Sequence, residues 1–284
     1  MIIIHLESEG ILTDAQHSFH AKRSCETQQL VSTMHDLTQR FEKGETIDVV
    51  ILDFAKAFDT VSHNLILFKL DRSGISNVLL NWIRDFLSNR TMSVVVEGAE
   101  SGVASVTSGV PQGSVLGPFL FILFINDLPD SVVSPCRLYA DDAIIYNSRD
   151  HQGQLQSDLD VLNSWANTWQ LGYSVSKCFL MTVGQKQSHK VQYTLAGSNL
   201  ELVDEHPYLG IVLQSNLTFS THINNIACKA RRLNGMLRRV LKDVNTKTKS
   251  TAFNTLVRPV LEYGCPVWDP FLKKDIKILQ KVRN

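Results

Sequence analysis

Two adjacent aspartates, Asp141 and Asp142, stand between two apolar stretches whose composition favours β-strands. The pattern predicts a hairpin whose tight turn carries both carboxylates. Neighbouring carboxylates repel each other, and a cation between them would remove that cost. Asp is also common in turns because its side chain bonds the local backbone. The pair alone is therefore compatible with a metal site or with an ordinary turn.

A third carboxylate, Asp53, ends a nearly continuous apolar run over residues 47–54. Such a run is typical of a strand buried on both faces. An acid at the end of a core strand is costly unless it is paired or coordinated, although a helix N-cap is the alternative role. The economical fold brings this strand end to the hairpin. Three converging carboxylates suit Mg²⁺, and two such ions about 3.5–4 Å apart support in-line phosphoryl transfer.

The composition is that of a globular protein, with 284 residues, 44% apolar and 20% charged. Basic and acidic residues are equal at 28 each, which argues against a wholly basic nucleic-acid binder but allows one basic face. Five scattered cysteines without a CxxC pair favour reduced thiols over disulfides or zinc. We find no signal peptide, and the most apolar window, 119–125, is too short to span a membrane. These features predict an intracellular protein of the nucleus or cytoplasm.

The order of elements is mixed α and β, followed by a helical, basic region from about residue 216. This order predicts an α+β core with a helical C-terminal subdomain. An apolar stripe that includes Trp165 and Trp169 has helical spacing, and we expect it to be core. The other expected elements near the acids are a hairpin over 93–107, a buried helix ending near residue 128, and strands over 173–183 and 207–213.

Three motifs, in this order and spacing, resemble the polymerase motifs of reverse transcriptases. The chain is most similar to the reverse transcriptases of animal non-LTR retrotransposons of the jockey-like kind. The resemblance covers essentially the whole chain, and the ordered set is far more specific than any one motif. Further matches lie at 16–19, 24–28, 62–67, 208–210 and 258–264. The three motifs are Asp53-Phe54-Ala55-Lys56-Ala57-Phe58-Asp59, Gly109-Val110-Pro111-Gln112-Gly113-Ser114-Val115-Leu116-Gly117-Pro118, and Tyr139-Ala140-Asp141-Asp142.

The resemblance implies a right-hand polymerase fold of fingers, a palm with an antiparallel sheet, and a helical thumb. The expected division is residual fingers over 1–47, a palm over 48–213 with a fingers-side insertion at about 64–108, and a thumb or connection over 214–284. The implied activity is that of an RNA-directed DNA polymerase, which extends a DNA primer on an RNA template with dNTPs by two-metal nucleotidyl transfer. The sequence leaves the oligomeric state open.

The resemblance also assigns the metal site. It implies Asp53, Asp141 and Asp142 as ligands of two Mg²⁺ ions, with Mn²⁺ as the alternative metal. The backbone carbonyl of Phe54 is a further candidate ligand, and Asp142 is the weaker member of the acidic pair. Lys177 falls where the family has a lysine near the triphosphate, and it could donate a proton to pyrophosphate. A surface lysine on a strand is the alternative.

Three further residues are implied to contact the nucleotide. Phe58 would be the steric gate that clashes with a 2′-hydroxyl, and a core aromatic is the alternative. Gln112 would lie near the template base and incoming nucleotide, and Gly113 would permit close approach of the backbone because it lacks a Cβ. The alternative for these two residues is a simple Pro-Gln-Gly turn.

Two regions are implied to hold the template–primer. The segment Tyr208, Leu209 and Gly210 resembles the primer grip, a hairpin that positions the primer 3′ end. The basic stretch 228–249 would be a thumb helix that meets phosphates without reading sequence. A solvated helix face is the alternative for this stretch. The basic residues expected to bind nucleic acid are Lys229, Arg231, Arg232, Arg238 and Arg239.

The chain also departs from the family. It begins after the first fingers motifs, and Arg23 is the nearest candidate for their triphosphate-binding residues. The family's Gln-His-Gly-Phe-Arg is represented by residues 16–20, in which Ser18 and His20 replace the glycine and the arginine. Two interpretations therefore remain: an active polymerase, or a truncated copy that binds template–primer without efficient synthesis. An RNA-templated RNA polymerase is a third, disfavoured because Phe58 fits selection of deoxynucleotides.

Overall fold

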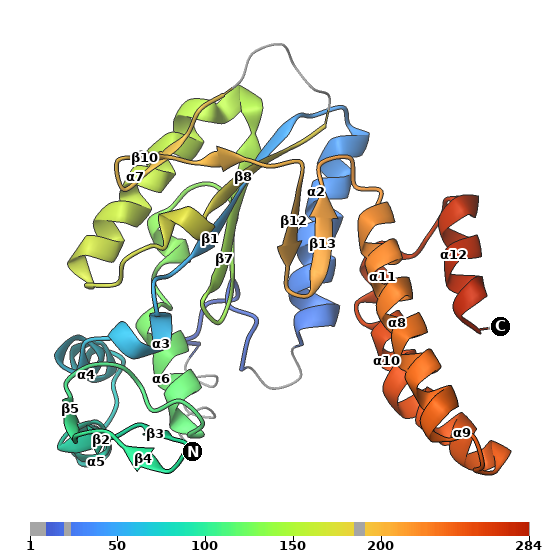
Figure 1. Cartoon of the computed structure of the whole chain (residues 1–284). Helices are drawn as coiled ribbons and strands as arrows, with labels where there is room; N and C mark the ends of the chain where they lie inside the picture. The colour runs from blue at the N-terminus through green and yellow to red at the C-terminus, as the bar shows by residue number, and fades with distance from the viewer. Residues whose placement is uncertain (1–9, 20–23, 185–190, 284) are drawn as a thin grey trace. The chain divides into compact units, whose positions relative to one another are not determined.

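The chain forms two compact units in the computed structural model, which describes residues 10–19, 24–184 and 191–283 (Figure 1). Arg23 lies outside the described residues. Each unit is built from separated pieces of the chain. The first comprises Met1–Arg23, Asp48–Leu180 and Gln187–Leu202, and the second comprises Ser24–Ile47, Met181–Lys186 and Val203–Asn284. The boundaries expected for fingers, palm and thumb stay predictions.

A five-stranded sheet, which lies mainly in the first unit, has the order β11-β8-β1-β7-β6. All residues of β1 except Asp53 are buried, as the continuous apolar run predicted. β6 and β7 pair as an antiparallel hairpin, and β11 runs parallel to β8. The strands are β1 Ile47–Asp53, β6 Cys136–Tyr139, β7 Asp142–Ser148, β8 Phe179–Val183 and β11 Glu201–Leu202.

The described residues of the first unit form five α-helices, and α6 is buried along nearly its whole length. The expected stripe on α7 is core, since Leu159, Leu162 and Trp165 are buried. α6 ends at Phe124, earlier than expected, because i→i−3 bonds then replace the helical pattern as far as Leu128. The helices are α3 Ala57–Thr60, α4 His63–Arg72, α5 Asn77–Leu87, α6 Leu116–Phe124 and α7 Gln152–Thr168.

Short hairpins complete the first unit. The one expected over 93–107 is present, but its tight turn is Glu97-Gly98, where both residues have positive φ, rather than the longer glycine-flanked loop. Its valines Val94, Val95, Val96 and Val103 are exposed, so the described residues do not cover this part of the two-stranded ribbon. The paired strands are β2 Arg90–Met92 with β5 Ala104–Val106, β3 Val95–Val96 with β4 Ala99–Glu100, and β9 Thr194–Leu195 with β10 Ser198–Asn199.

The second unit is mostly helical, and α8, α10 and α12 pack around a small apolar core. The strand expected over 207–213 is instead a hairpin, β12–β13, with its turn at Leu209-Gly210. No helix in the described part of the chain is long and apolar enough to cross a bilayer. The elements are a π-helical turn Cys25–Leu30, α2 Val31–Glu42, β12 Glu205–Tyr208, β13 Ile211–Gln214, α8 Ser220–Val240, α9 Thr246–Ala252, a second π turn Phe253–Val257, α10 Arg258–Glu262, α11 Cys265–Trp268 and α12 Lys273–Arg283.

Candidate active site

The acidic pair lies at a two-residue hairpin turn, as predicted. Tyr139 pairs with Asp142, so Ala140 and Asp141 form the loop and Asp142 begins β7. Of the two loop residues, Ala140 alone has a positive φ, 53°. A positive φ at the first loop position is the II′ pattern, which usually has glycine there. An alanine in this conformation costs about 1–2 kcal/mol, so other contacts have to hold the turn.

Asp53 ends the neighbouring strand β1. Its backbone carbonyl accepts a hydrogen bond of 2.8 Å from Ser174 N, and its N–H donates to Cys178 Sγ at 3.3 Å. Its carboxylate Oδ2 is buried and accepts no hydrogen bond from the described residues. Lys177 Nζ lies 3.6 Å from that oxygen. A buried carboxylate oxygen without a donor is costly, so this atom is suited to a cation.

The three aspartates repel one another electrostatically, and this repulsion contributes to the raised pKa values of Asp141 and Asp142. Burial, together with the smaller effects of the Asp141 and Asp53 charges, raises the pKa of Asp142 to about 6. Burial likewise raises the pKa of Asp141, and Asp53 adds to the increase while Lys177 opposes it. The carboxylates are therefore near enough to interact, and a bound cation would favour their charged forms.

The donor set fits a hard divalent cation, but the protein alone does not complete a site. Among the described residues, no group of three or more His, Cys, Asp or Glu side chains is placed to hold a metal ion. Mg²⁺ commonly uses one or two carboxylates and takes its remaining ligands from water and substrate phosphates. The orphaned Oδ2 of Asp53 and the repelling pair, Asp141 and Asp142, are the groups that such an ion would use.

Lys177 is brought to Asp53 by local structure that the sequence did not predict. Val175–Lys177 is a 3₁₀ turn rather than the expected strand, because Ser174 N bonds the Asp53 carbonyl instead of continuing a ladder. The Lys177 side chain is 71% exposed. Its ammonium therefore lies beside the acids and is open to solvent, which suits either a ligand contact or a surface ion pair.

Two aromatic residues of the first motif have different surroundings. Phe54 is buried and stacks on Tyr173 with ring centroids 4.8 Å apart. Phe58 is half-buried and lies on Phe121 of α6, with centroids 4.5 Å apart. Phe58 therefore has one face against the core, as a core aromatic would, and keeps an accessible part, as a gate would require.

The second motif is bonded directly to the first. Val110 N donates to the Phe58 carbonyl at 2.7 Å, and the side-chain amide of Gln112 donates to Asp59 Oδ1 at 2.8 Å. Gly109 lies so close that a Cβ would be 2.7 Å from the Asp59 carbonyl oxygen. The contact requires glycine at position 109, and it fixes exposed Gln112 beside the first motif.

Gly113 has a different reason to be glycine. Its φ is +80°, which disfavours residues with a Cβ. Apart from Gly113 itself and its two chain neighbours, no described residue has an atom within 4 Å of where that Cβ would be. Space next to the backbone is therefore open to a ligand, and the positive φ alone already accounts for the glycine.

The expected primer grip is the tip of the β12–β13 hairpin in the second unit. Leu209 and Gly210 both have positive φ, as a type I′ turn requires. Tyr208 is buried, and its hydroxyl accepts a 2.6 Å hydrogen bond from Gln29. Tyr263 closes the other side, donating from its hydroxyl to the Leu209 carbonyl at 2.9 Å. Tyr208 thus supports the hairpin, and within the segment 208–210 the accessible residues are Leu209 and Gly210.

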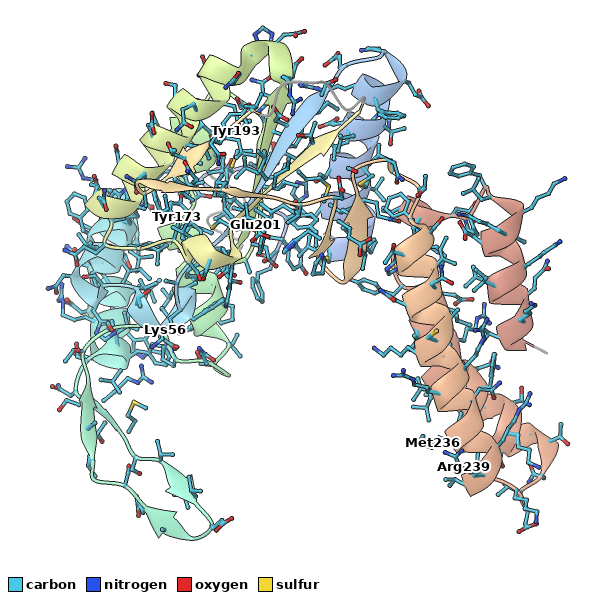
Figure 2. The ribbon with its side chains drawn as sticks, turned by 45° about the horizontal axis from the view of Figure 1, so that its top comes forward. Lys56, Tyr173, Tyr193, Glu201, Met236 and Arg239 are labelled. Carbon is cyan, nitrogen blue, oxygen red and sulfur yellow. The ribbon has the colours of Figure 1, made fainter. Side chains whose placement is uncertain are left out.

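All five predicted basic residues lie on α8 and are exposed. At about 3.6 residues per turn, Lys229, Arg232 and Arg239 share the side opposite the buried alanines. Figure 2 shows Arg239 and Met236 on this side. Arg231 lies at the flank, where it donates to the Ile278 carbonyl of α12 at 3.1 Å. We call Lys229, Arg232 and Arg239 the outer basic face.

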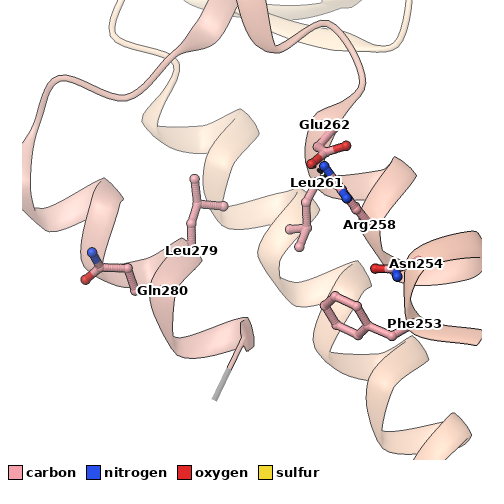
Figure 3. Close-up of a pocket in the computed structure, with 7 residues that line it drawn as sticks. All are labelled: Phe253, Asn254, Arg258, Leu261, Glu262, Leu279 and Gln280. Carbon is pink, nitrogen blue, oxygen red and sulfur yellow. Dashed lines mark hydrogen bonds and ion pairs between the residues drawn. The ribbon is translucent and has the colours of Figure 1, made fainter. Parts of the chain in front are cut away.

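A separate cavity of about 480 Å³ lies in the second unit, between α12 and the residues around Arg258 (Figure 3). Arg258 forms an i,i+4 ion pair with Glu262 at 2.6 Å at its wall. The charge of Arg258 is balanced by Glu262, and much of the lining is apolar. The cavity therefore differs in character from the acidic site. It contains none of the residues predicted to act on a nucleotide.

Comparison with known proteins identifies the fold and the family. The family model described as "Reverse transcriptase (RNA-dependent DNA polymerase)" matches residues 1–213. The chain belongs to the reverse transcriptase family. It is 30% identical over 272 residues to the RNA-directed DNA polymerase from mobile element jockey of Drosophila melanogaster, covering 89% of this chain and 30% of that protein. It is 27% identical to the probable RNA-directed DNA polymerase from transposon X-element of the same species, over 100% of this chain and 32% of that protein.

The predicted resemblance to non-LTR retrotransposon polymerases is thereby confirmed, although this reverse transcriptase chain spans about a third of the length of these relatives. A solved telomerase from Candida albicans, in complex with a telomeric RNA fragment, has a TM-score of 0.51 at 13% identity and covers 99% of this chain and 49% of that one. An apo telomerase from Candida tropicalis gives 0.50 at 11% identity, covering 99% and 52%. This likeness concerns the fold alone and confirms the predicted α+β polymerase fold.

Several supporting residues were not predicted from the sequence. Asp59 belongs to the first motif but had no predicted role, yet its carboxylate accepts a hydrogen bond from the Gln112 side chain. Tyr173 stacks on Phe54, and Gln16 and Ser18 bond the acidic turn from more than 120 residues away. A polar residue inside a matched motif was the one available signal for Gln16, Ser18 and Asp59. Tyr173 carried none.

Proposed function

We propose that this reverse transcriptase chain catalyses RNA-directed DNA synthesis, extending a DNA primer on an RNA template with dNTPs. The observation that carries the proposal is the acidic cluster. Asp53 presents a buried carboxylate oxygen without a donor, next to the repelling pair Asp141 and Asp142. These residues would hold two Mg²⁺ ions, or Mn²⁺, together with the Phe54 carbonyl and the substrate phosphates. When bound, the ions would lower the pKa of the primer hydroxyl and stabilise the leaving pyrophosphate.

The chain's own residues would supply the remaining tasks. Lys177 Nζ, exposed beside Asp53, would hold a proton and donate it to the pyrophosphate oxygen. Phe58, supported on one face by Phe121, would meet a 2′-hydroxyl and exclude ribonucleotides. Gln112 would orient the template base and nucleotide, held by its bond to Asp59. The open space beside Gly113 would admit the nucleic acid.

A second candidate is a protein that binds template–primer without efficient synthesis. The observation that favours it is that the three carboxylates interact but, among the described residues, are not placed closely enough to hold a metal ion by themselves. Binding would then use the outer basic face of α8 and the hairpin tip at Leu209 and Gly210. Both candidates predict affinity for an RNA–DNA duplex, so binding alone does not distinguish them.

Primer extension distinguishes the two candidates. The intact chain is given a labelled DNA primer on an RNA template with dNTPs and Mg²⁺, alongside Asp141→Asn. Asp85→Asn, an exposed change on α5, is the matched control for the lost charge. We expect extension by the wild type and by Asp85→Asn, and none by Asp141→Asn. Duplex binding by all three proteins, with extension by none, would favour the binding protein instead.

A further inference from the structure

Residues 15–17 lie along the edge of the main sheet. Leu138 N donates to the Ala15 carbonyl at 2.8 Å, and His17 N donates to the Leu138 carbonyl at 3.0 Å. Gln16 and Leu138 form a parallel bridge, and β6 is the terminal strand in the sheet order. The segment therefore runs alongside β6, parallel to it, toward the turn that carries Asp141.

Two buried side chains of this segment reach the turn itself. The backbone N–H of Ala140 donates to Ser18 Oγ at 2.9 Å and to Gln16 Oε1 at 3.2 Å. Ser18 is fixed in turn, because its hydroxyl and its N–H donate to the same Gln16 oxygen at 2.8 and 3.0 Å. Gln16 is 0% exposed and Ser18 is 2% exposed. Two buried side chains therefore hold the half-buried peptide group of Ala140.

That peptide group is where the turn is strained. Ala140 has a φ of 53°, and it lies in the loop between the paired residues Tyr139 and Asp142. An N–H group turned away from water needs an acceptor, and here both acceptors come from Gln16 and Ser18. Asp141 directly follows Ala140 in the chain. Contacts that fix the Ala140 peptide therefore also fix the backbone from which the Asp141 and Asp142 side chains project.

We propose that Gln16 and Ser18 are positioning residues, which hold the Ala140 peptide and so pre-orient Asp141 and Asp142 for divalent cations. The proposal rests on the proposed function for its effect on synthesis, while its structural part stands alone. Groups that orient metal ligands in this way commonly change metal affinity about 10–100-fold when removed. The substitutions Gln16→Leu and Ser18→Ala, made together, remove both acceptors.

Amide hydrogen exchange tests the structural part without any activity. In the wild type we expect protection of the amides of Ala140 and Leu138. In the double variant we expect the Ala140 amide to exchange freely while Leu138, bonded to Ala15, stays protected. Loss of protection at both amides would mean that the whole segment undocks, and retained protection at Ala140 would mean that the two side chains do not hold the turn. Either result would overturn the proposal.

Primer extension over a Mg²⁺ series tests the consequence. We expect the half-saturating Mg²⁺ concentration of the double variant to rise about tenfold, with little change in the KM for dNTP at saturating Mg²⁺. Ser18→Thr, which keeps the hydroxyl, should retain wild-type behaviour. Asn126→Ala is the matched control, because Asn126 anchors the same segment through Thr13 N at 2.8 Å and the Ile11 carbonyl at 2.7 Å without touching the turn.

An equal shift in Asn126→Ala would assign the effect to general loosening of the segment and would count against positioning. Should the wild type fail to extend any primer, the proposed function fails. The exchange result at Ala140 and Leu138 then still decides whether Gln16 and Ser18 hold the turn.

Discussion

Asp59 accepts a hydrogen bond from Gln112, 53 residues further along the chain, at 2.8 Å. The bond joins α3, which contains the end of the first motif, to the loop of the second motif. Its backbone counterpart is the close approach of Gly109, where a Cβ would lie 2.7–2.8 Å from the Asp59 and Phe58 backbone. The two motifs are thus packed directly against each other, and the hydrogen bond to Asp59 sets the position of the Gln112 side chain.

Gly109→Ala should break this contact. The new Cβ meets backbone atoms, which cannot move aside as a flexible side chain could, and the residue has a φ of +83°. We expect the free energy of unfolding to fall by about 3 kcal/mol or more in urea titrations. Gly113→Ala is the matched control, because its φ of +80° gives a similar strain in open space, and it should lose about 1 kcal/mol. Equal losses would show that the close approach contributes nothing.

Two tyrosines of the first unit, both labelled in Figure 2, should respond oppositely to loss of the hydroxyl. The Tyr173 hydroxyl is buried and has no hydrogen-bond partner among the described residues, whereas the Tyr193 hydroxyl donates to buried Asp48 at 3.0 Å. Tyr173→Phe removes a polar group that was desolvated without compensation, and should raise the free energy of unfolding by about 1 kcal/mol. Tyr193→Phe should lower it by about 2 kcal/mol, since a bond to a charged group is lost. Urea unfolding of both variants checks the signs.

The site was predictable where it depends on local pattern. The apolar run before Asp53 and the strands flanking Asp141 and Asp142 determine their elements without help from distant residues. Lys177 was placed on a strand, since the tertiary bond from Ser174 N to the Asp53 carbonyl leaves no trace in residue spacing. The same holds for Gln16, which reaches Ala140 across 124 residues.

Burial of Tyr208 has a similar long-range origin. The motif predicts that Tyr208 contacts the primer. In the structure its hydroxyl accepts a hydrogen bond from Gln29, 179 residues earlier in the chain. Periodicity identifies which elements form, whereas side chains that bond across the sequence depend on how those elements pack. The accessible part of the expected primer grip is therefore narrower than the motif.

Lys69 should make stability depend on pH. Its ammonium lies 3.7 Å from the Trp169 ring centroid and 2.6 Å from Asp127 Oδ1. Burial lowers its pKa from 10.5 to about 8, against the opposing hydrogen bond and charge of Asp127. Because the folded-state pKa is the lower one, the unfolded chain binds more protons between pH 8 and 10.5, and the free energy of unfolding rises across that window.

The Lys69 contribution to this rise is about 3 kcal/mol, and Lys69→Met should abolish it. Urea unfolding at pH 8 and 10.5 measures the difference between wild type and variant. Exposed Lys56→Met is the control and should keep the wild-type slope. A variant whose stability changes with pH as the wild type does would contradict the lowered pKa.

Phe58→Ala should relax discrimination against ribonucleotides. Phe58 lies on Phe121, and if its ring is the steric gate of the proposed function, removing it opens the space that a 2′-hydroxyl needs. Single-nucleotide extension with dNTP and the matching rNTP gives the ratio of kcat/KM for the two substrates. Phe86→Ala, which also truncates a half-buried ring packed on the core, controls for lost stability. An unchanged ratio in Phe58→Ala would leave Phe58 as a core aromatic only.

The outer basic face of α8 should contribute to duplex affinity in a salt-dependent way. Each phosphate neutralised by a side chain releases counterions, so the logarithm of the affinity falls with the logarithm of salt in proportion to the number of contacts. Changing Lys229, Arg232 and Arg239 to Gln removes three exposed charges without removing buried surface. If all three meet phosphates, the slope against salt should decrease by about 2–3 for an RNA–DNA duplex.

Net charge alone would also weaken binding, so an equal change elsewhere is needed. The exposed lysines Lys273, Lys274 and Lys277 of α12 provide it, because the triple Gln variant loses the same three charges from another helix. Fluorescence anisotropy of a labelled duplex over a range of salt measures both slopes. Specific contact by α8 predicts a large change in the first variant and a small one in the second, whereas equal slopes would mean that α8 acts only through the overall charge of the protein.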